Sequence, residues 1–189
     1  MQSTQILRAE HDAVLGVLSQ LEEAVALAEQ GVPVPKDIFS DIQGFLAGFV
    51  DQCHHHKEES AVFTQLEAAP AGRQIAWQLT AEHESGRALA AVFAAAVAGY
   101  LPGNVASARR VGQATAAYAA MLRRHIEEEN TELFPVMEQT FAREQDAGIA
   151  REFDRIELED IGEGKHEQYH AMIDSLPARI APWKSQRVA

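Results

Sequence analysis

Apolar residues recur three and four positions apart along almost the whole chain, and no long stretch alternates apolar and polar residues as a strand does. Proline- and glycine-rich stretches interrupt this pattern at residues 31–35, 69–72 and 102–104, and a weaker break falls near Gly148. The helices that the pattern predicts span residues 4–30, 36–67, 73–100 and 104–142. Four long helices joined by short loops indicate an all-α, up-down-up-down four-helix bundle.

The C-terminal part of the chain predicts a further helical segment over residues 150–177. Gly162 and Gly164 are expected to interrupt it, because glycine has the largest backbone entropy to lose in a helix. We therefore expect two parts, a bundle over residues 1–145 and a helical extension over residues 146–189 that packs on the bundle.

The two halves of the predicted bundle resemble each other in sequence. Leu-Arg-Ala-Glu-His, ending at His11, returns 72 residues later as Leu-Thr-Ala-Glu-His, ending at His83. The pattern His-x-x-x-Glu occurs at His54–Glu58 and returns 71 residues later at His125–Glu129. The helical hairpins related in this way span residues 4–67 and 73–142. A duplicated hairpin is a natural source of a two-fold symmetric site.

The histidines and glutamates of these repeats fall on helix rows that otherwise hold apolar residues. Residues i and i+4 share one face of a helix, so the imidazole and the carboxylate of each His-x-x-x-Glu pair project together. The row of His54, for example, runs through Val50 and Val62. At about 1.5 Å per residue, all of these side chains lie in one layer roughly 10–25 Å from one end of the bundle. The candidate ligands are His11, His54, Glu58, His83, His125 and Glu129.

Burial of two carboxylates without compensating charge would cost several kcal/mol each. Two divalent cations would remove this cost, and their charge would leave room for anionic ligands such as hydroxide or peroxide. With two histidines on each cation and both carboxylates bridging, each cation keeps open coordination positions. Imidazole and carboxylate with open positions suit iron or manganese better than a closed structural zinc site. The residues therefore predict a dinuclear metal centre.

Composition restricts the partners and the compartment. The 189-residue chain has 16 Lys and Arg against 28 Asp and Glu, a net charge of −12 at pH 7, so we expect it to bind neither nucleic acid nor an anionic membrane. The single cysteine, Cys53, excludes an internal disulfide framework and a Cys-rich zinc finger and fits a reducing cytosol. The longest apolar run, Ala88–Leu101, is too short to span a bilayer, and no export signal precedes the first helix. We therefore expect a cytoplasmic protein.

The order of the candidate ligands, together with the stretches 53–59 and 133–135, resembles the hemerythrin-like (HHE cation-binding) domain family over nearly the whole chain. The resemblance implies a four-helix bundle with a non-haem di-iron centre, in which the six candidate residues are the metal ligands. It also implies that the two carboxylates and an oxo or hydroxo group bridge the irons, with manganese or zinc as substitutes. Such a centre binds O₂ or related small molecules.

Two departures from the oxygen-carrying hemerythrins narrow the resemblance. Those proteins have a second histidine four residues after the one in the third helix, where this chain has Arg87. They also place an aspartate five residues after the histidine of the fourth helix, where this chain has Glu129 at four. The chain therefore resembles the four-His, two-Glu branch, which includes iron–sulfur repair and iron-sensing members. Reversible O₂ carriage is less expected, and so is repair, because repair members usually carry an extra cysteine-bearing N-terminal domain.

We expect a di-iron protein that binds or senses O₂, NO or peroxide, with a small diatomic molecule or peroxide as its partner. One alternative is a di-iron enzyme that decomposes peroxide or reduces NO. Another alternative is a metal storage or structural protein without turnover. The sequence leaves open whether the protein is an enzyme and which protein it contacts.

His55 and Glu59 form a rival to the neighbouring His-x-x-x-Glu pair. Their helix row passes through Ala47 and Asp51 and is more polar, so we favour the pair one residue earlier. Two further histidines stand four apart in the C-terminal segment, at His166 and His170. They either lie on a solvated face, supply a fifth histidine to the centre, or form an outer metal site with the rival pair.

The other polar residues near the predicted centre have simpler interpretations. Cys53 is expected to be a small buried residue, within reach of oxidation by chemistry at the metals. Glu10 and Glu82 either orient the histidines of adjacent helices or serve as helix caps or surface charges. Tyr118 is expected to belong to the core rather than to ligate a metal.

Overall fold

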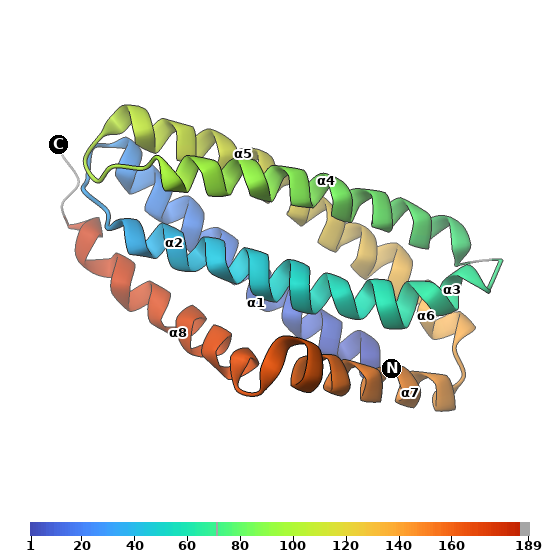
Figure 1. The fold of residues 1–189 in the computed structure, drawn as a ribbon. Coiled ribbons are helices and arrows are strands. Elements are labelled where there is room, and N and C mark those ends of the chain that lie inside the picture. Colours follow the sequence, from blue (N-terminus) through green and yellow to red (C-terminus); the bar gives the residue numbers. More distant parts are fainter. Residues whose placement is uncertain (71, 186–189) are drawn as a thin grey trace.

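The computed structural model describes residues 1–70 and 72–185, and the regular secondary structure of these ranges is helical throughout (Figure 1). Short π-helical segments, labelled η, continue several α-helices without a break. In chain order the elements are α1 (Gln2–Glu29), α2 (Lys36–Phe45), η1 (Leu46–His55), η2 (Glu58–Phe63), α3 (Thr64–Glu67), α4 (Arg73–Ala98), α5 (Val105–Glu128), η3 (Glu129–Leu133), α6 (Phe134–Thr140), α7 (Arg143–Arg155), η4 (Ile156–Gly162) and α8 (Lys165–Lys184).

Four rods of helix form the bundle (Figure 1). The first rod is α1, and the second consists of α2, η1, η2 and α3 in succession. The third rod is α4, and the fourth consists of α5, η3 and α6. Helix α5 packs against both α1 and α4, and α2 packs against α4. The predicted all-α four-helix bundle is therefore confirmed.

The C-terminal segment begins earlier than the sequence pattern indicates. The predicted break near Gly148 is wrong, because Gly148 lies inside α7, which begins at Arg143. The chain instead breaks at Phe141 and Ala142, whose backbone is extended with φ and ψ of −90° and 130°, and −69° and 161°. No proline or glycine stands at these two positions, so the usual sequence markers of a helix end are missing there.

The predicted interruption of the C-terminal segment by two glycines is confirmed. Gly162 and Gly164 have φ of +106° and +77°, a region that residues with a Cβ rarely adopt. The turn at these residues separates η4 from α8. It sends α8 along the outside of the bundle, where α8 packs against α1 and α2, while α7 packs against α1 and η2 (Figure 1).

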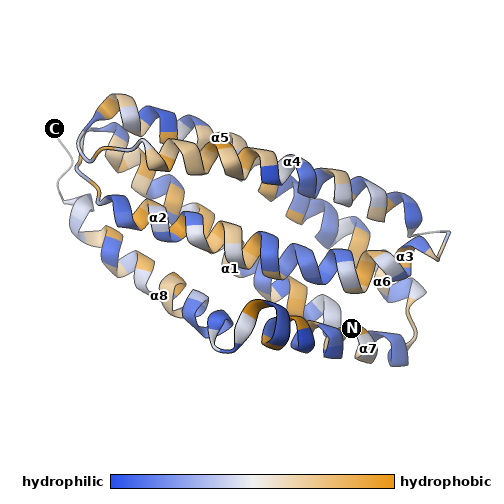
Figure 2. Cartoon of the chain, in the orientation of Figure 1, coloured by the Kyte–Doolittle hydropathy of each residue, from blue (hydrophilic) through white to orange (hydrophobic). Residues whose placement is uncertain are grey.

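Two apolar clusters fill the bundle, one toward each end, and polar residues lie between them. On α1, Leu7 belongs to the smaller cluster and Val14 to the larger one, with the buried His11 between them. The other rods cross from one cluster to the other in the same way, for example from Val50 to Val62 in the second rod. Figure 2 shows hydrophobic and hydrophilic residues side by side along each helix, as amphipathic helices require.

Glycine allows α8 to approach the bundle closely at one position. A Cβ on Gly48 would overlap the phenol ring of Tyr169 on α8. The Tyr169 ring also packs edge-on against Phe45 and Phe49, at centroid distances of 6.0 and 5.8 Å. Over the described ranges, none of the helices combines the length and the apolar character that crossing a membrane requires.

Asp146 of α7 caps the first turn of α1 from across the molecule. Its carboxylate accepts hydrogen bonds from the backbone N–H groups of Gln2 (2.8 Å) and Ser3 (3.0 Å) and from the Ser3 hydroxyl (2.6 Å). Burial favours the neutral carboxyl group, but these hydrogen bonds outweigh burial and hold the pKa of Asp146 below its ordinary value. Helix α1 has no side-chain cap of its own, so Asp146 supplies the acceptors that its first N–H groups need.

Replacing Asp146 with alanine is expected to lower the free energy of unfolding by about 1–3 kcal/mol at neutral pH, because buried donors lose their acceptor. The contribution of the carboxylate is present above the pKa of an unfolded aspartate, about 4, and is lost as the pH falls through the lower folded-state pKa. Urea unfolding at neutral and at strongly acidic pH measures this effect. The exposed Asp154 on the same helix provides the control variant, D154A. A deficit of D146A that did not shrink on acidification would contradict the role of the carboxylate.

Candidate metal centre

The six candidate ligands lie together in one buried layer between the two apolar clusters, which we call the His/Glu layer. None of the six residues is more than 2% exposed. The layer consists of His11 on α1, His54 on η1, Glu58 on η2, His83 on α4, His125 on α5 and Glu129 on η3.

Two of the four rods change from α-helix to π-helix at the His/Glu layer. His54 and Glu58 lie in π-helical segments of the second rod, and Glu129 begins the π-helical segment of the fourth rod. The first and third rods, which contribute one histidine each, stay α-helical. A π-helical turn holds an extra residue, so it shifts which side chains face inward, and such turns are frequent at functional sites. The positions of these turns are not evident from the sequence pattern.

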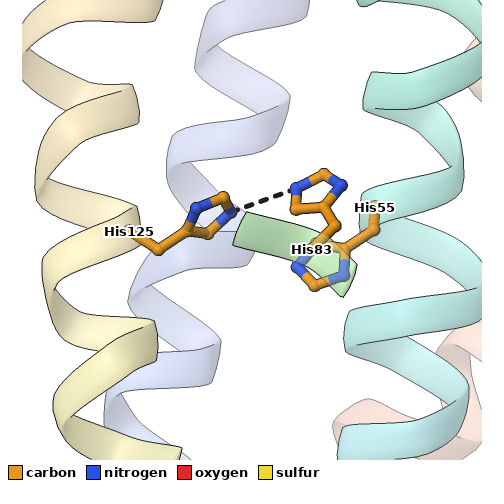
Figure 3. A group of neighbouring side chains, drawn as sticks. All are labelled: His55, His83 and His125. Atoms are coloured by element: carbon orange, nitrogen blue, oxygen red, sulfur yellow. Dashed lines mark hydrogen bonds between the residues drawn. The ribbon is translucent and has the colours of Figure 1, made fainter. Parts of the chain in front are cut away.

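The four histidines of the layer form two facing pairs. The Nε2 atoms of His11 and His54 lie 3.1 Å apart, and the Nε2 atoms of His83 and His125 are also 3.1 Å apart. Figure 3 shows the second pair pointing toward each other from α4 and α5. Two neutral imidazoles cannot both direct lone pairs at each other at this distance without repulsion, so each pair requires a proton or a cation between or beside the nitrogens.

The two carboxylates lie between the histidine pairs. Glu129 places Oε2 3.0 Å from His11 Nε2 and Oε1 3.1 Å from His125 Nε2, one oxygen for each pair. Glu58 Oε2 lies 3.4 Å from His83 Nε2 and 3.7 Å from His54 Nε2. None of the four carboxylate oxygens has a hydrogen-bond partner among the described residues. Buried carboxylates with unpartnered oxygens fit a metal pair, because metal ions would satisfy them.

Each histidine of the layer has an oxygen atom beside its outer ring nitrogen. His54 Nδ1–H donates to Glu10 (2.8 Å), and His125 Nδ1–H donates to Glu82 (3.0 Å). Of the two interpretations open for Glu10 and Glu82, the structure therefore selects orientation of the histidines. A protonated Nδ1 leaves the Nε2 lone pair directed into the layer, which is the arrangement that metal-binding histidines use.

The other two histidines of the layer have outer partners that the sequence analysis did not assign to them. His83 Nδ1–H donates to Glu59 (2.7 Å), and His11 Nδ1 lies 3.2 Å from the amide oxygen of Asn130. Sequence reasoning placed Glu59 in a rival pair and overlooked Asn130. The position of Asn130, directly after Glu129, is the only feature of the sequence that could have drawn attention to it.

The buried carboxylates favour positive charge on His83 and His125 of the His/Glu layer. Burial alone would lower the pKa of His83, but Glu129, Glu58 and Glu59 raise it to about 11. Burial would also lower the pKa of His125, but Glu129 raises it to about 9. Burial raises the pKa of Glu129, but the surrounding histidines hold it well below the ordinary value. The layer therefore contains buried negative charge, which is stable only with protons or cations beside it.

His55 is buried next to the His/Glu layer, although its helix row predicted a more polar environment. It is 3% exposed, and its ring stacks on that of His83 with a centroid distance of 3.8 Å and an angle of 17° (Figure 3). Neither ring nitrogen has a hydrogen-bond partner within the described part of the chain. Burial and the neighbouring histidines lower the pKa of His55 to about 3, against the opposing effect of Asp51, so the ring is neutral.

Glu59 pairs with other residues rather than with His55. Besides the hydrogen bond from His83, Glu59 accepts one from Arg87 (2.7 Å), and Arg87 also donates to Asp51 (2.7 Å). Burial raises the pKa of Glu59, but His83 and Arg87 lower it to about 2. Arg87 therefore serves as a partner of two carboxylates.

The two C-terminal histidines lie together at the interface of α8 and the bundle. His166 and His170 approach each other to 2.7 Å between their Nε2 atoms, and His166 Nδ1 lies 3.2 Å from Glu157. His166 also forms a group with Glu157 and Cys53, whose candidate ligand atoms lie within 4.8 Å of one another. Cys53 is buried, as expected. Among the described residues, this group includes neither His55 nor Glu59.

Lys57 is a buried cation that sequence reasoning overlooked. Its ammonium group donates to Glu10 and to Glu157, and the side chain is fully buried. Burial would lower the pKa of Lys57, but Glu10 and the neighbouring acceptors raise it above its ordinary value. Since Glu10 also accepts from His54, a continuous series of charged contacts joins the His/Glu layer to η4. Tyr118, by contrast, belongs to the larger apolar cluster, as expected.

The part of the chain that matches a known protein family includes the whole His/Glu layer. Residues 2–137 match the model of the family described as hemerythrin HHE cation-binding domain. The matched range holds all six residues of the His/Glu layer, whereas α7, η4 and α8 lie outside it. No curated protein matches the chain.

Proposed function

The chain belongs to the hemerythrin HHE cation-binding domain family, and from this premise we propose that it holds two iron ions in the His/Glu layer and binds or senses O₂, NO or peroxide. The proposed ligands are His11 and His54 for one iron, His83 and His125 for the other, and Glu58 and Glu129 for both. An oxo or hydroxo group would be a further ligand of the irons, and manganese or zinc would be substitutes for iron.

The observation that carries this proposal is the position of the two carboxylates. Glu129 contacts one histidine of each pair, and Glu58 does the same, so each carboxylate is oriented as a bridge between two metal positions. Two groups of potential ligands share these carboxylates, and each group adds one of the histidine pairs. Four nitrogen and two carboxylate ligands with open positions suit iron, as in the carboxylate-bridged centres of other helical bundles.

Charge supports a function with small anionic or easily reduced ligands. Two divalent ions would exceed the charge of Glu58 and Glu129, so the centre would favour an additional anionic ligand. Iron would supply open coordination positions and electrons for O₂, NO or peroxide. The Nδ1 partners Glu10, Glu59, Glu82 and Asn130 hold the four imidazoles in place while the ligand binds.

Aromatic rings close the layer on the side of the smaller apolar cluster. Phe134 stacks on His11 with a centroid distance of 5.4 Å, and Phe63 stacks on His83 at 5.5 Å. Both phenylalanines are at most 2% exposed. They restrict the rotation of the two imidazoles and exclude water from this side, so a ligand bound in the layer would be protected from bulk solvent.

The contacts of Lys57 favour sensing over storage. A change in charge at the metals would act on His54 and, through Glu10 and Lys57, on Glu157 of η4. Glu157 in turn contacts His166 of α8. A storage protein has no need of such a connection between its metal site and an outer helical segment, whereas a sensor requires one.

Anaerobic loading with ferrous iron, followed by exposure to air or NO, tests the proposal. We expect two irons per chain by metal analysis, and a visible absorption band that develops on exposure and reverses when the gas is removed. The same measurements on the variant E127A, which changes an exposed glutamate next to the layer, provide the control.

Each other outcome counts against a particular part of the proposal. Sustained evolution of O₂ from added peroxide would replace binding or sensing with catalysis. A protein that remains colourless and retains only zinc through chelation would exclude both redox functions. A wild-type chain that binds no metal would overturn the assignment of the His/Glu layer itself.

A further inference from the structure

A second group of potential metal ligands lies outside the His/Glu layer, where η1, η4 and α8 meet. It consists of Cys53 on η1, Glu157 on η4 and His166 on α8, and we call it the outer cluster. The candidate ligand atoms of these three residues lie within 4.8 Å of one another. Two of the three residues lie beyond the range that matches the hemerythrin HHE cation-binding domain, so the family match assigns no role to the cluster.

The imidazole of His166 directs one nitrogen toward the outer cluster. Nδ1 lies 3.2 Å from Oε1 of Glu157, but it is buried and makes no hydrogen bond with any described residue. Nε2 lies 2.7 Å from Nε2 of His170, so one of these two nitrogens donates a hydrogen bond to the other. When His166 is the donor, its Nδ1 carries a lone pair directed at the cluster, which is the tautomer that a metal ion requires.

Neighbouring rings hold His166 in this orientation. Phe49, which is fully buried in the bundle, lies edge-on to the imidazole at a centroid distance of 5.6 Å. His170 stacks on the imidazole at 4.7 Å with an angle of 29°. Because both neighbours restrict rotation of the ring, Nδ1 stays on the side of Cys53 and Glu157.

The charges around the outer cluster are compatible with a bound cation. The ammonium group of Lys57 contacts Glu157, but it also contacts Glu10 of α1. Lys57 therefore keeps a carboxylate partner when Glu157 turns toward a metal ion. A divalent cation would balance the charges of a Cys53 thiolate and of the Glu157 carboxylate. The thiol is 2% exposed, so this part of the cluster is shielded from water.

Two pockets beside His166 make the outer cluster accessible. One, of about 180 Å³, is lined by His166, Glu157 and the glycines of the turn between η4 and α8. The other, of about 190 Å³, is lined by His166, His170 and Glu10. Glu157 and His166 are themselves only half-buried. An ion can therefore reach the cluster from solvent without passing through the His/Glu layer.

We propose that the outer cluster binds one borderline-soft divalent cation such as zinc, through Sγ of Cys53, a carboxylate oxygen of Glu157 and Nδ1 of His166. One sulfur, one nitrogen and one oxygen ligand suit zinc, and three protein ligands leave a fourth tetrahedral position for water. His170 orients the ligating imidazole. The ion ties η4 and α8 to the second rod of the bundle. This proposal requires no metal in the His/Glu layer and is independent of the proposed function.

Titration of the metal-free, reduced protein with cobalt in the absence of oxygen tests the proposal. A thiolate bound to cobalt gives an intense charge-transfer band, whereas imidazole and carboxylate ligands give no comparable band. Cys53 is the only cysteine of the sequence, and the His/Glu layer offers nitrogen and oxygen atoms alone, so the band reports on the outer cluster. We expect the wild-type protein to develop this band with one cobalt per chain, and added zinc to abolish it.

Variants of the outer cluster test each ligand. C53A is expected to lose the band entirely. H166A and E157Q are expected to bind cobalt at this site at least about 100-fold more weakly, because the loss of groups that merely orient a ligand already costs 10- to 100-fold. H170A removes such an orienting group and is expected to weaken binding about 10- to 100-fold. H56A removes a partly exposed histidine of the same rod and is expected to keep the band at wild-type affinity.

Cadmium NMR of the wild-type protein tests the same proposal without any substitution. Cadmium with a sulfur ligand resonates at a higher frequency than cadmium with only nitrogen and oxygen ligands. One sulfur-bound cadmium per chain is therefore expected. This measurement remains decisive if a variant fails to fold.

The outcomes separate this proposal from the proposed function. A wild-type protein with neither the thiolate band nor the sulfur-bound cadmium would overturn the outer site. A band that persisted at wild-type affinity in H166A and E157Q would also overturn it, since Cys53 would then bind cobalt without the other ligands. C53A is expected to bind one cobalt fewer than the wild type, whether the His/Glu layer holds two ions or none. A wild-type protein that bound a single ion, through the thiolate, would support the outer site and overturn the proposed function.

Discussion

Replacing Glu129 with alanine is expected to weaken the binding of both metal ions by at least about 100-fold, so that the purified variant contains almost none. The reason is that Glu129 contacts a histidine of each pair, His11 through one oxygen at 3.0 Å and His125 through the other at 3.1 Å. No single histidine of the His/Glu layer has this position. Metal analysis of protein that has been reconstituted with excess iron and then desalted measures the effect.

Two further variants place this result in context. H54A removes a ligand of one pair and is expected to lower the metal content from two ions to about one per chain. E127A changes an exposed glutamate two residues before Glu129 and is expected to retain both ions. An E129A protein that is folded and retains two ions per chain would refute the assignment of Glu129 as a bridging ligand.

Removal of metal is expected to lower the midpoint of thermal unfolding by about 8–16 °C. A ligand present at 1,000 times its Kd stabilises the folded state by about 4 kcal/mol, and 1 kcal/mol corresponds to about 2–4 °C for a chain of this size. The physical cause is the His/Glu layer, where carboxylate oxygens that find no hydrogen-bond partner among the described residues lie among closely facing imidazoles. Protons would only partly replace the metal there.

Calorimetry of the metal-loaded protein and of the chelated protein measures this difference. The E129A variant provides the control, since its midpoint is expected to be insensitive to added metal or chelator. If chelation removed all metal from the wild-type protein without shifting the midpoint, the layer would be stable with protons alone, and the argument from its buried charge would be wrong.

The helical architecture could be predicted because it depends on local patterns. The 3.6-residue periodicity of apolar positions and the glycines and prolines between the helices are properties of neighbouring residues, and they define all four rods of the bundle. The break at Phe141 and Ala142 could not be predicted in this way. No glycine or proline marks it, and contacts of α7 with α1, such as the capping by Asp146, accompany the turn.

The candidate ligands followed from the repeat and from their positions on apolar rows, but the buried position of His55 did not. Its helix row includes Asp51, which indicated a polar face. In the folded chain, the second rod is π-helical up to His55, Asp51 is engaged by Arg87, and His55 packs on His83 of another rod. A regular helical wheel cannot represent such a change of register.

The sequence by itself determined the fold class, the duplicated hairpin and the choice of six candidate ligands, because each of these follows from the spacing of residue types along the chain. Only the tertiary structure decided which atoms meet. His11 reaches Asn130 over 119 residues of sequence, and His54 reaches Glu10 over 44. The two orphaned nitrogens of His55 likewise depend on what packs around them. Burial and hydrogen-bond partners are properties of contacts between distant segments, so spacing along a single chain does not fix them.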